Sequence, residues 1–181
     1  MTGEKPKLGA YGERSVWKVM INAPIETVWN TLVKTDDVLP FFFGAVCDTE
    51  SGIKVGKSMR MVSKNRKFAI VVGKVLEFTP PHRYSHTLAF TQNEGEEPAI
   101  VTYELKEIPG GTEFPLSSEA IPGTKTAKLV ASGPFIVGNL TAVAETGRPL
   151  FSGRMVMALG PLMSLMTPKI SRIENWPLDR I

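Results

Sequence analysis

The segment 84–90, YSHTLAF, contains the titratable side chain best placed for chemistry. Its alternation is typical of a strand with one buried face, so His86 should share that face with aromatic and aliphatic side chains. If Phe90 pairs with Ala99 in the next strand, His86 lies opposite Tyr103. Such a pair on a cavity wall could orient a ligand carbonyl or hydroxyl, or transfer a proton. The alternative is that His86 is a core residue with its hydrogen bonds satisfied, or lies at the sheet edge.

A second group of candidate residues is apolar. Three phenylalanines follow one another at 41–43, and two methionines, Met59 and Met61, share one face of a predicted strand. Aromatic and flexible side chains of this kind suit an apolar ligand, and they would serve equally well as plain core. The predicted ligand-binding residues are Phe41, Phe43, Met59, Met61, Phe68, His86, Tyr103, Phe114 and Leu116.

Other kinds of site find little support in the residue types. His82 and His86 are the only histidines, and Cys47, the only cysteine, is interpreted as a small buried hydrophobe. No G-x-S-x-G elbow occurs, so Ser117 and Ser118 are interpreted as ordinary strand residues. We therefore predict no metal, no cofactor and no catalytic residue, and regard an enzyme as less favoured than a binding protein.

The composition is that of one folded domain. Of 181 residues, 43% are hydrophobic and 22% are charged, close to the average for folded proteins. No apolar run reaches the roughly 18 residues of a membrane span, and the start of the chain lacks a signal-like stretch, so we expect a cytoplasmic protein without a span. The net charge of +3 is spread along the chain, which argues against nucleic-acid binding.

The first part of the chain predicts a strand followed by a helix. Residues 15–22 are rich in β-branched and apolar types. After Pro24, the residues Val28, Trp29 and Leu32 recur at helical spacing, which places Trp29 in the core. Residues 36–44 are expected to form a short turn and a loop.

Residues 45–121 predict a meander of about six strands. The best-defined hairpin turns at 108–111, where a four-residue loop would place Leu105 opposite Phe114 and Tyr103 opposite Leu116. All four apolar side chains would then share one buried face.

After Ile121 a long helix is expected. Ser132 is a plausible cap, Pro134 fits the first turn and Gly147 ends the helix, which could extend backwards through TAKLVA.

The last apolar segment, RMVMALGPLMSLM, is interrupted by Gly160-Pro161, so we expect one or two short helices there. This gives a flexible tail (1–13), a domain (14–147) and a helical extension (148–181).

Three blocks in this order carry a family resemblance: INAPIETVWNTL, GKVLEFTPPHRYSHTLAF and VTYELKEIPGGTEF. Together they resemble the SRPBCC superfamily, specifically the proteins similar to the activator of the heat-shock-protein-ninety ATPase. The resemblance implies an α+β helix-grip fold, in which a curved antiparallel sheet of about seven strands wraps round a long C-terminal helix. It also implies a cavity between sheet and helix. Members of the superfamily include ligand carriers, polyketide cyclases and chaperone regulators.

Three functions follow as hypotheses. The leading one is a protein that binds a hydrophobic small molecule, such as a lipid, in the cavity. The second is a polyketide cyclase or dehydratase-like enzyme using His86 or Tyr103, and the third is an interaction protein that regulates a chaperone. The extension 148–181 could close the cavity, form a homodimer contact or cover apolar surface.

Overall fold

The computed structural model describes residues 13–181, so the predicted flexible tail lies outside the described residues except for Glu13. The strands are β1 (Glu13–Ile21), β2 (Val38–Leu39), β3 (Ala45–Thr49), β4 (Ser58–Val62), β5 (Ala69–Thr79), β6 (Arg83–Phe90), β7 (Ala99–Glu104), β8 (Lys106–Ile108) and β9 (Gly111–Ala120). The helices are α1 (Ile25–Leu32), α2 (Lys125–Val130), α3 (Gly133–Thr146) and α4 (Phe151–Met166).

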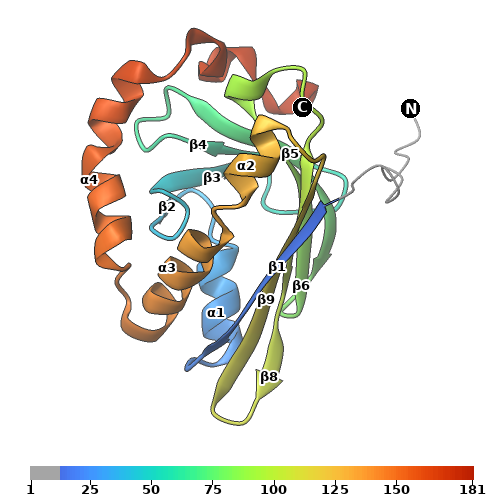
Figure 1. The fold of residues 1–181 in the computed structure, drawn as a ribbon, viewed down its shortest axis with the longest axis vertical. Coiled ribbons are helices and arrows are strands. Elements are labelled where there is room, and N and C mark those ends of the chain that lie inside the picture. Colours follow the sequence, from blue (N-terminus) through green and yellow to red (C-terminus); the bar gives the residue numbers. More distant parts are fainter. Residues whose placement is uncertain (1–12) are drawn as a thin grey trace.

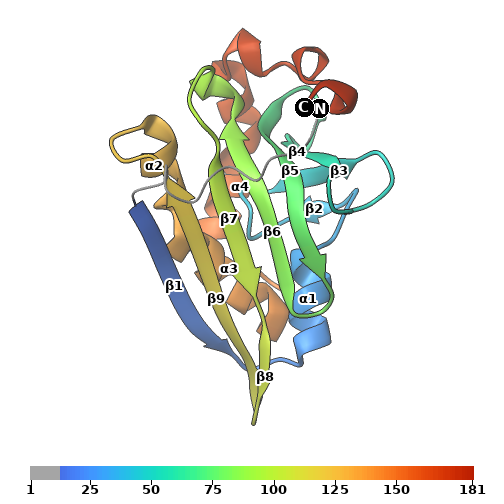
Figure 2. The ribbon, with the colours of Figure 1, turned by 90° about the vertical axis from the view of Figure 1, so that its right-hand side faces the viewer.

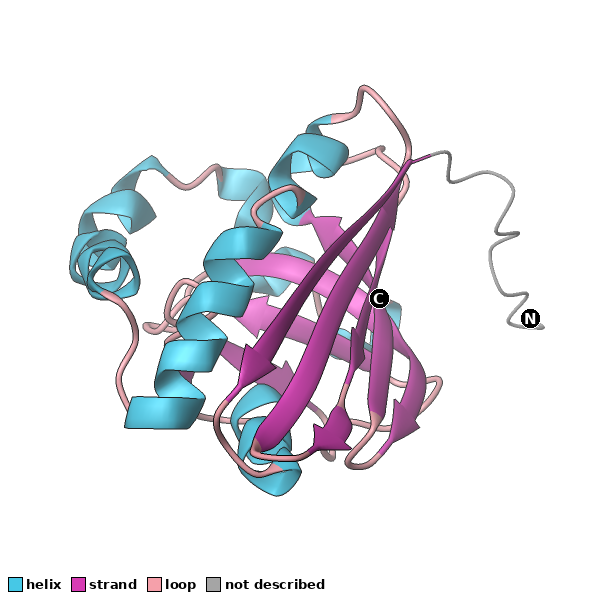
Figure 3. Ribbon diagram, turned by 60° about the horizontal axis from the view of Figure 1, so that its bottom comes forward, coloured by secondary structure: helices cyan, strands magenta, loops and turns pink. Residues whose placement is uncertain are grey.

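These strands form one antiparallel sheet in the order β1-β9-β7-β6-β5-β4-β3-β2, with β8 paired to β9. The sheet curls strongly, and α1 and α3 lie on its concave side (Figures 1 and 2). Seen from below, α2 and α3 run along the same face (Figure 3). The predicted α+β helix-grip fold is confirmed, and the sheet exceeds the expected seven strands because β2 and β8 add two very short ones.

Helix α1 forms where the spacing of apolar residues predicted it. Its buried face consists of Ile25, Val28, Trp29 and Leu32, and it packs beside α3 at one end of the sheet. Trp29 contacts Phe78 of β5, with ring centroids 5.3 Å apart. The prediction that Trp29 belongs to the core is confirmed.

The hairpin that leads into β9 has the predicted register. Ile108 pairs with Gly111 across the turn, and Tyr103 of β7 lies opposite Leu116 of β9. The turn fixes this register because it is short, and Gly110 there adopts a φ of +87° that favours glycine.

The register between β6 and β7 differs from the prediction by two residues. Leu88, not Phe90, pairs with Ala99, so His86 lies opposite Val101 and Tyr84 lies opposite Tyr103. The chain leaves the β7 ladder early because residues 91–93 form a 3₁₀ turn, where the Thr91 hydroxyl donates to the Ala69 carbonyl at 2.7 Å. A shift of two residues preserves the alternation, so His86 and Tyr103 still share the inner face.

The expected long helix is divided into α2 and α3. Ser132 stands at the N-cap position directly before α3, but its hydroxyl donates to the Leu129 carbonyl at 2.7 Å and makes no capping hydrogen bond. Gly147 ends α3 as predicted, with a φ of +74°.

The span Lys125–Thr146 is long and apolar enough to cross a membrane by length and composition. Within it, Ile136, Val137 and Leu140 are buried in the core of the domain. The core helix of a folded domain passes the same test, so length and composition alone do not indicate a membrane span here.

The prediction that Gly160-Pro161 interrupts the last apolar segment is wrong. Helix α4 is continuous over 16 residues with Pro161 inside it. Proline removes one backbone hydrogen bond, and water can replace that bond on a helix as exposed as α4. After α4 the chain returns along the sheet in three short 3₁₀ turns, at Lys169–Ser171, Ile173–Asn175 and Leu178–Arg180.

Candidate functional site

A small apolar cavity lies between the sheet and the α2–α3 segment. Its volume is about 40 Å³, enough for water-sized molecules only. The walls come from β1, β6, β7, β9, both helices and the loop between β2 and β3, and they are formed by Trp17, Phe42, Phe43, Leu88, Phe90, Val101, Tyr103, Leu116, Ser118, Leu129, Val130, Ser132, Gly133 and Ile136.

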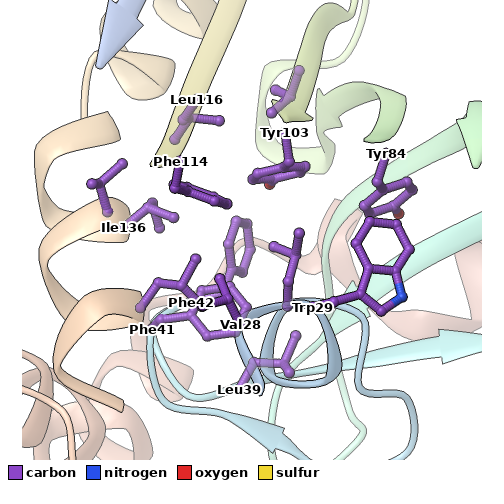
Figure 4. Packing of buried hydrophobic residues seen from close by; sticks show 14 of the residues in the cluster. Val28, Trp29, Leu39, Phe41, Phe42, Tyr84, Tyr103, Phe114, Leu116 and Ile136 are labelled. Carbon is purple, nitrogen blue, oxygen red and sulfur yellow. The ribbon is translucent and has the colours of Figure 1, made fainter. Parts of the chain in front are cut away.

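Side chains of the protein itself fill most of the space between sheet and helices. Figure 4 shows Phe114 and Leu116 of β9 and Ile136 of α3 directed towards Phe41 and Phe42 from the opposite side. All of these are buried. The interior is therefore packed like an ordinary core, apart from the cavity.

Phe43 forms the most exposed part of the cavity wall. Phe41 and Phe42 are buried, whereas Phe43 is 39% exposed and stacks on Phe135 of α3, with centroids 4.7 Å apart and ring planes within 3°. Its φ of +54° lies in the left-handed region, which costs a non-glycine residue roughly 1–2 kcal/mol. Phe43 is thus held in place by its stacking partner and not by a favourable backbone conformation.

The adjacent Gly44 allows close contact with α4. A Cβ atom at Gly44 would lie 2.8 Å from Cγ of Met157, and the φ of +73° also favours glycine. The loop that carries Phe43 therefore touches both α3 and α4.

Beyond the cavity, three rings from two strands form a stacked group in the interior. Tyr84 lies 5.6 Å from Tyr103 and 5.0 Å from His86, measured between ring centroids. His86 lies 5.9 Å from Tyr103. Only Tyr103 of the three lines the cavity, and His86 is buried outside its wall.

His86 is buried and neutral. Its Nδ1 lies 2.8 Å from the Thr87 carbonyl, and a carbonyl can only accept, so Nδ1 carries the proton and Nε2 is a bare acceptor without a hydrogen-bond partner. Burial lowers the pKa of His86 to about 4, although the bond to Thr87 opposes this shift. A base this weak is poorly matched to proton transfer near neutral pH.

The other interior groups are also held uncharged. Burial raises the pKa of Tyr84 and of Tyr103, and the negative charge that Cys47 would carry as a thiolate adds to both shifts. Burial, followed by the charges of Asp48 and Asp36, raises the pKa of Cys47 to about 12. Cys47 is a small buried residue, as predicted.

The nine predicted ligand-binding residues fall into two groups. Phe43, Tyr103 and Leu116 line the cavity. The other six lie elsewhere: Phe41, Met59, Met61, His86 and Phe114 are buried in the core, and Phe68 lies at the start of the β5 hairpin, bridged to Arg172.

Several cavity residues were not singled out from the sequence. Leu88 and Val101 follow the same alternation as His86 and Tyr103, so the strand pattern could have predicted them as residues of the inner face. Trp17 and Ser118 meet only because β1 pairs with β9, a contact between segments about a hundred residues apart.

A larger hollow of about 310 Å³ lies on the surface near the last residues of the chain. Its walls carry both signs of charge, from Glu50, Lys57, Lys74 and Asp179. No group of three or more metal-ligating side chains occurs among the described residues.

The curled sheet around α3 defines a helix-grip protein of the SRPBCC superfamily. The chain belongs to the family described as "Activator of Hsp90 ATPase homolog 1-like protein", whose family model matches residues 22–138. No curated protein matches the chain.

Solved structures share this fold at low sequence identity. An HSP90 activator from Plasmodium falciparum is 19% identical with a TM-score of 0.57, and the match covers 76% of this chain and 99% of that one. An AHSA1-like protein from Aeromonas hydrophila is 19% identical with a TM-score of 0.53, covering 75% and 94%. DynU16, a putative protein in the dynemicin biosynthetic locus, is 22% identical with a TM-score of 0.59, covering 75% of this chain and 48% of that one.

Proposed function

We propose that this protein binds a small apolar ligand between the sheet and α3, and that the structure is the closed form. The observation that supports this is an apolar cavity in whose wall Phe43 is exposed and stacks on Phe135, a residue outside the wall. Ligand pockets usually measure roughly 300–1,000 Å³, so a ligand must displace side chains to be held here. We expect Phe43 to move first, because it is the most exposed side chain of the wall and movement of its loop would relieve an unfavourable backbone conformation.

An enzymatic role has weaker support. A cyclase-like reaction needs several acids or bases that converge on the substrate with pKa values near neutrality. Here Tyr103 is the one titratable side chain that lines the cavity, and its pKa is raised by burial. His86 lies behind it with its pKa lowered.

Regulation of a chaperone is the second candidate. The family description and the P. falciparum HSP90 activator favour it. Measuring the ATPase rate of Hsp90 with and without this protein separates the two functions, because a ligand carrier should leave that rate unchanged.

The first test of ligand binding is native mass spectrometry of the protein purified from its own host. Under gentle conditions we expect a discrete non-covalent mass that disappears on denaturation. An apo mass, together with failure to bind the uncharged apolar dye N-phenylnaphthylamine, would count against the proposal.

Matched variants locate the binding site of the dye. Ser118→Val places extra methyl groups in the cavity and should weaken binding roughly tenfold, since overpacking costs ~1–3 kcal/mol. Ser117→Val makes the same change on the opposite face of β9 and should leave the affinity unaltered. Phe135→Ala removes the stacking partner of Phe43 and should speed dye association. Equal affinities in the two serine variants would place the dye elsewhere.

A further inference from the structure

Helix α4 presents an apolar face to solvent. Its inner side touches the domain at two places, where Gly153 lies against the Asn139 side chain and Met157 lies against Gly44. Residues on the opposite side recur at spacings of three and four and form one continuous stripe. This stripe, called the outer face of α4, consists of Phe151, Met155, Leu159, Leu162, Leu165 and Met166, all exposed.

Both ends of α4 are attached to the domain. At the start, the Leu150 amide donates to Oδ1 of Asn139 at 3.1 Å. Beyond the end, the hydroxyls of Thr91 and Ser171 form a buried hydrogen bond at 2.8 Å, in which Thr91 accepts because its own proton goes to the Ala69 carbonyl. Figure 1 shows α4 at the edge of the molecule, and the attachments at its two ends restrict its movement.

The charges in the chain segment that contains α4 have one sign. Between Glu145 and Glu174 the sequence contains no acidic residue, but it contains four basic ones: Arg148, Arg154, Lys169 and Arg172. All four are exposed, and none forms an ion pair within residues 13–181. Arg60 and Arg83 on the sheet are by contrast paired with carboxylates.

We propose that the outer face of α4 binds an anionic lipid surface. Large apolar side chains flanked by unpaired bases are the features of a helix that lies in the interface of such a membrane. Sixteen residues extend only ~24 Å, less than the ~30 Å hydrocarbon core, and both ends return to the domain. Helix α4 therefore lies along the membrane surface and does not span the bilayer.

Charge complementarity favours lipid over a second copy of the chain. In a symmetric dimer the same face meets itself, so two outer faces would bring both sets of unpaired bases together without any acid. An anionic headgroup layer offers each base a counter-charge. Membrane binding through the outer face of α4 does not require a ligand in the cavity.

The test is sedimentation of the whole protein with vesicles of phosphatidylcholine mixed with phosphatidylglycerol. Leu162→Glu places a charge in the apolar stripe and should weaken vesicle binding about tenfold or more. Val55→Glu is the matched control, because Val55 is 61% exposed and Leu162 is 60% exposed. Arg154→Gln should weaken binding roughly fivefold, and added salt should weaken it in the wild type.

Four results would overturn the proposal. They are a wild type that does not sediment with these vesicles, equal binding to vesicles of phosphatidylcholine alone, and equal losses in Leu162→Glu and Val55→Glu. The fourth is a dimer in solution that Leu162→Glu converts to a monomer, without vesicle binding. Circular dichroism confirms that each variant is folded, and Arg154→Gln tests the proposal even if Leu162→Glu unfolds.

Discussion

At the residue scale, the interior of this domain contains polar atoms that lack partners. Nε2 of His86 and the hydroxyl of Tyr84 are buried without a hydrogen bond. Such atoms cost free energy, commonly ~1–3 kcal/mol each, because they lose water and gain nothing in exchange. His86 in addition must remain neutral, since charging it in this position is costlier still.

Stability should therefore depend on pH through His86. The unfolded chain has a histidine pKa near 6.5, whereas the folded value is about 4, so between these values the unfolded state binds a proton that the native state does not. The free energy of unfolding should fall as the pH is lowered through this window, by up to ~1.4 kcal/mol per pH unit. His86→Phe should remove this part of the slope, measured as urea unfolding of both proteins at several pH values.

His82→Gln serves as the control, because His82 is exposed at the turn before β6. It should retain the wild-type dependence on pH. A His86→Phe protein with an unchanged slope would show that His86 does not remain neutral in the folded state.

At the element scale, the β5–β6 pairing depends on one glycine. The register shifts between Val75 and Glu77, and next to this region the Lys74 amide donates to the Thr87 hydroxyl at 2.8 Å. A Cβ atom at Gly73 would lie 1.8 Å from the Thr87 carbonyl oxygen, the same atom that accepts from His86. The sheet can hold His86 in this position only if residue 73 lacks a side chain.

Gly73→Ala should accordingly destabilise the protein strongly. The overlap involves backbone atoms of a neighbouring strand, so no side chain can rotate to relieve it, and we expect a loss of ~3 kcal/mol or more in urea unfolding. Gly138→Ala removes a glycine from the interior of helix α3, and the new Cβ atom would contact only Leu150, at 3.4 Å. That variant should gain up to ~1 kcal/mol. Similar stabilities for the two variants would contradict the claim that the β5–β6 pairing requires a glycine at position 73.

At the scale of the whole molecule, the last residues of the chain are attached to the sheet. Arg60 of β4 connects the two, because its guanidinium donates to Asp48 and to the Trp176 carbonyl, both at 2.7 Å. The ion pair is largely buried, and Asp48 has a second, longer ion pair with Arg66 at 3.5 Å. The β4 strand thus positions a segment more than a hundred residues away.

Arg60→Ala should release this segment. Removing one member of a buried ion pair costs ~3–5 kcal/mol, and it also deletes the bond to Trp176. We expect faster amide hydrogen exchange over residues 169–181 than in the wild type. Arg14→Ala removes an exposed pair with Glu119 and should change stability by less than ~1 kcal/mol. Unchanged exchange in Arg60→Ala would mean that other contacts hold the segment.

The sequence by itself determined the elements and several of their faces. Helical spacing predicted α1 and the burial of Trp29, and a short turn predicted the pairing of Tyr103 with Leu116, because these features depend on residues close together in the chain. The family blocks predicted the helix-grip fold.

Only the tertiary structure decided which residue lies opposite His86, how little of the cavity is open and which apolar segment is left exposed. Strand pairing after a long loop depends on distant hydrogen bonds such as that from Thr91 to Ala69, which no local pattern encodes. The extension 148–181 was expected to close the cavity, form a homodimer contact or cover apolar surface, and the structure shows that α4 itself exposes large apolar side chains. The volume of the cavity is the space enclosed by sheet and helices minus the volume of the side chains that fill it. Both quantities depend on how all the elements pack together, so the sequence pattern of single elements does not predict the cavity volume.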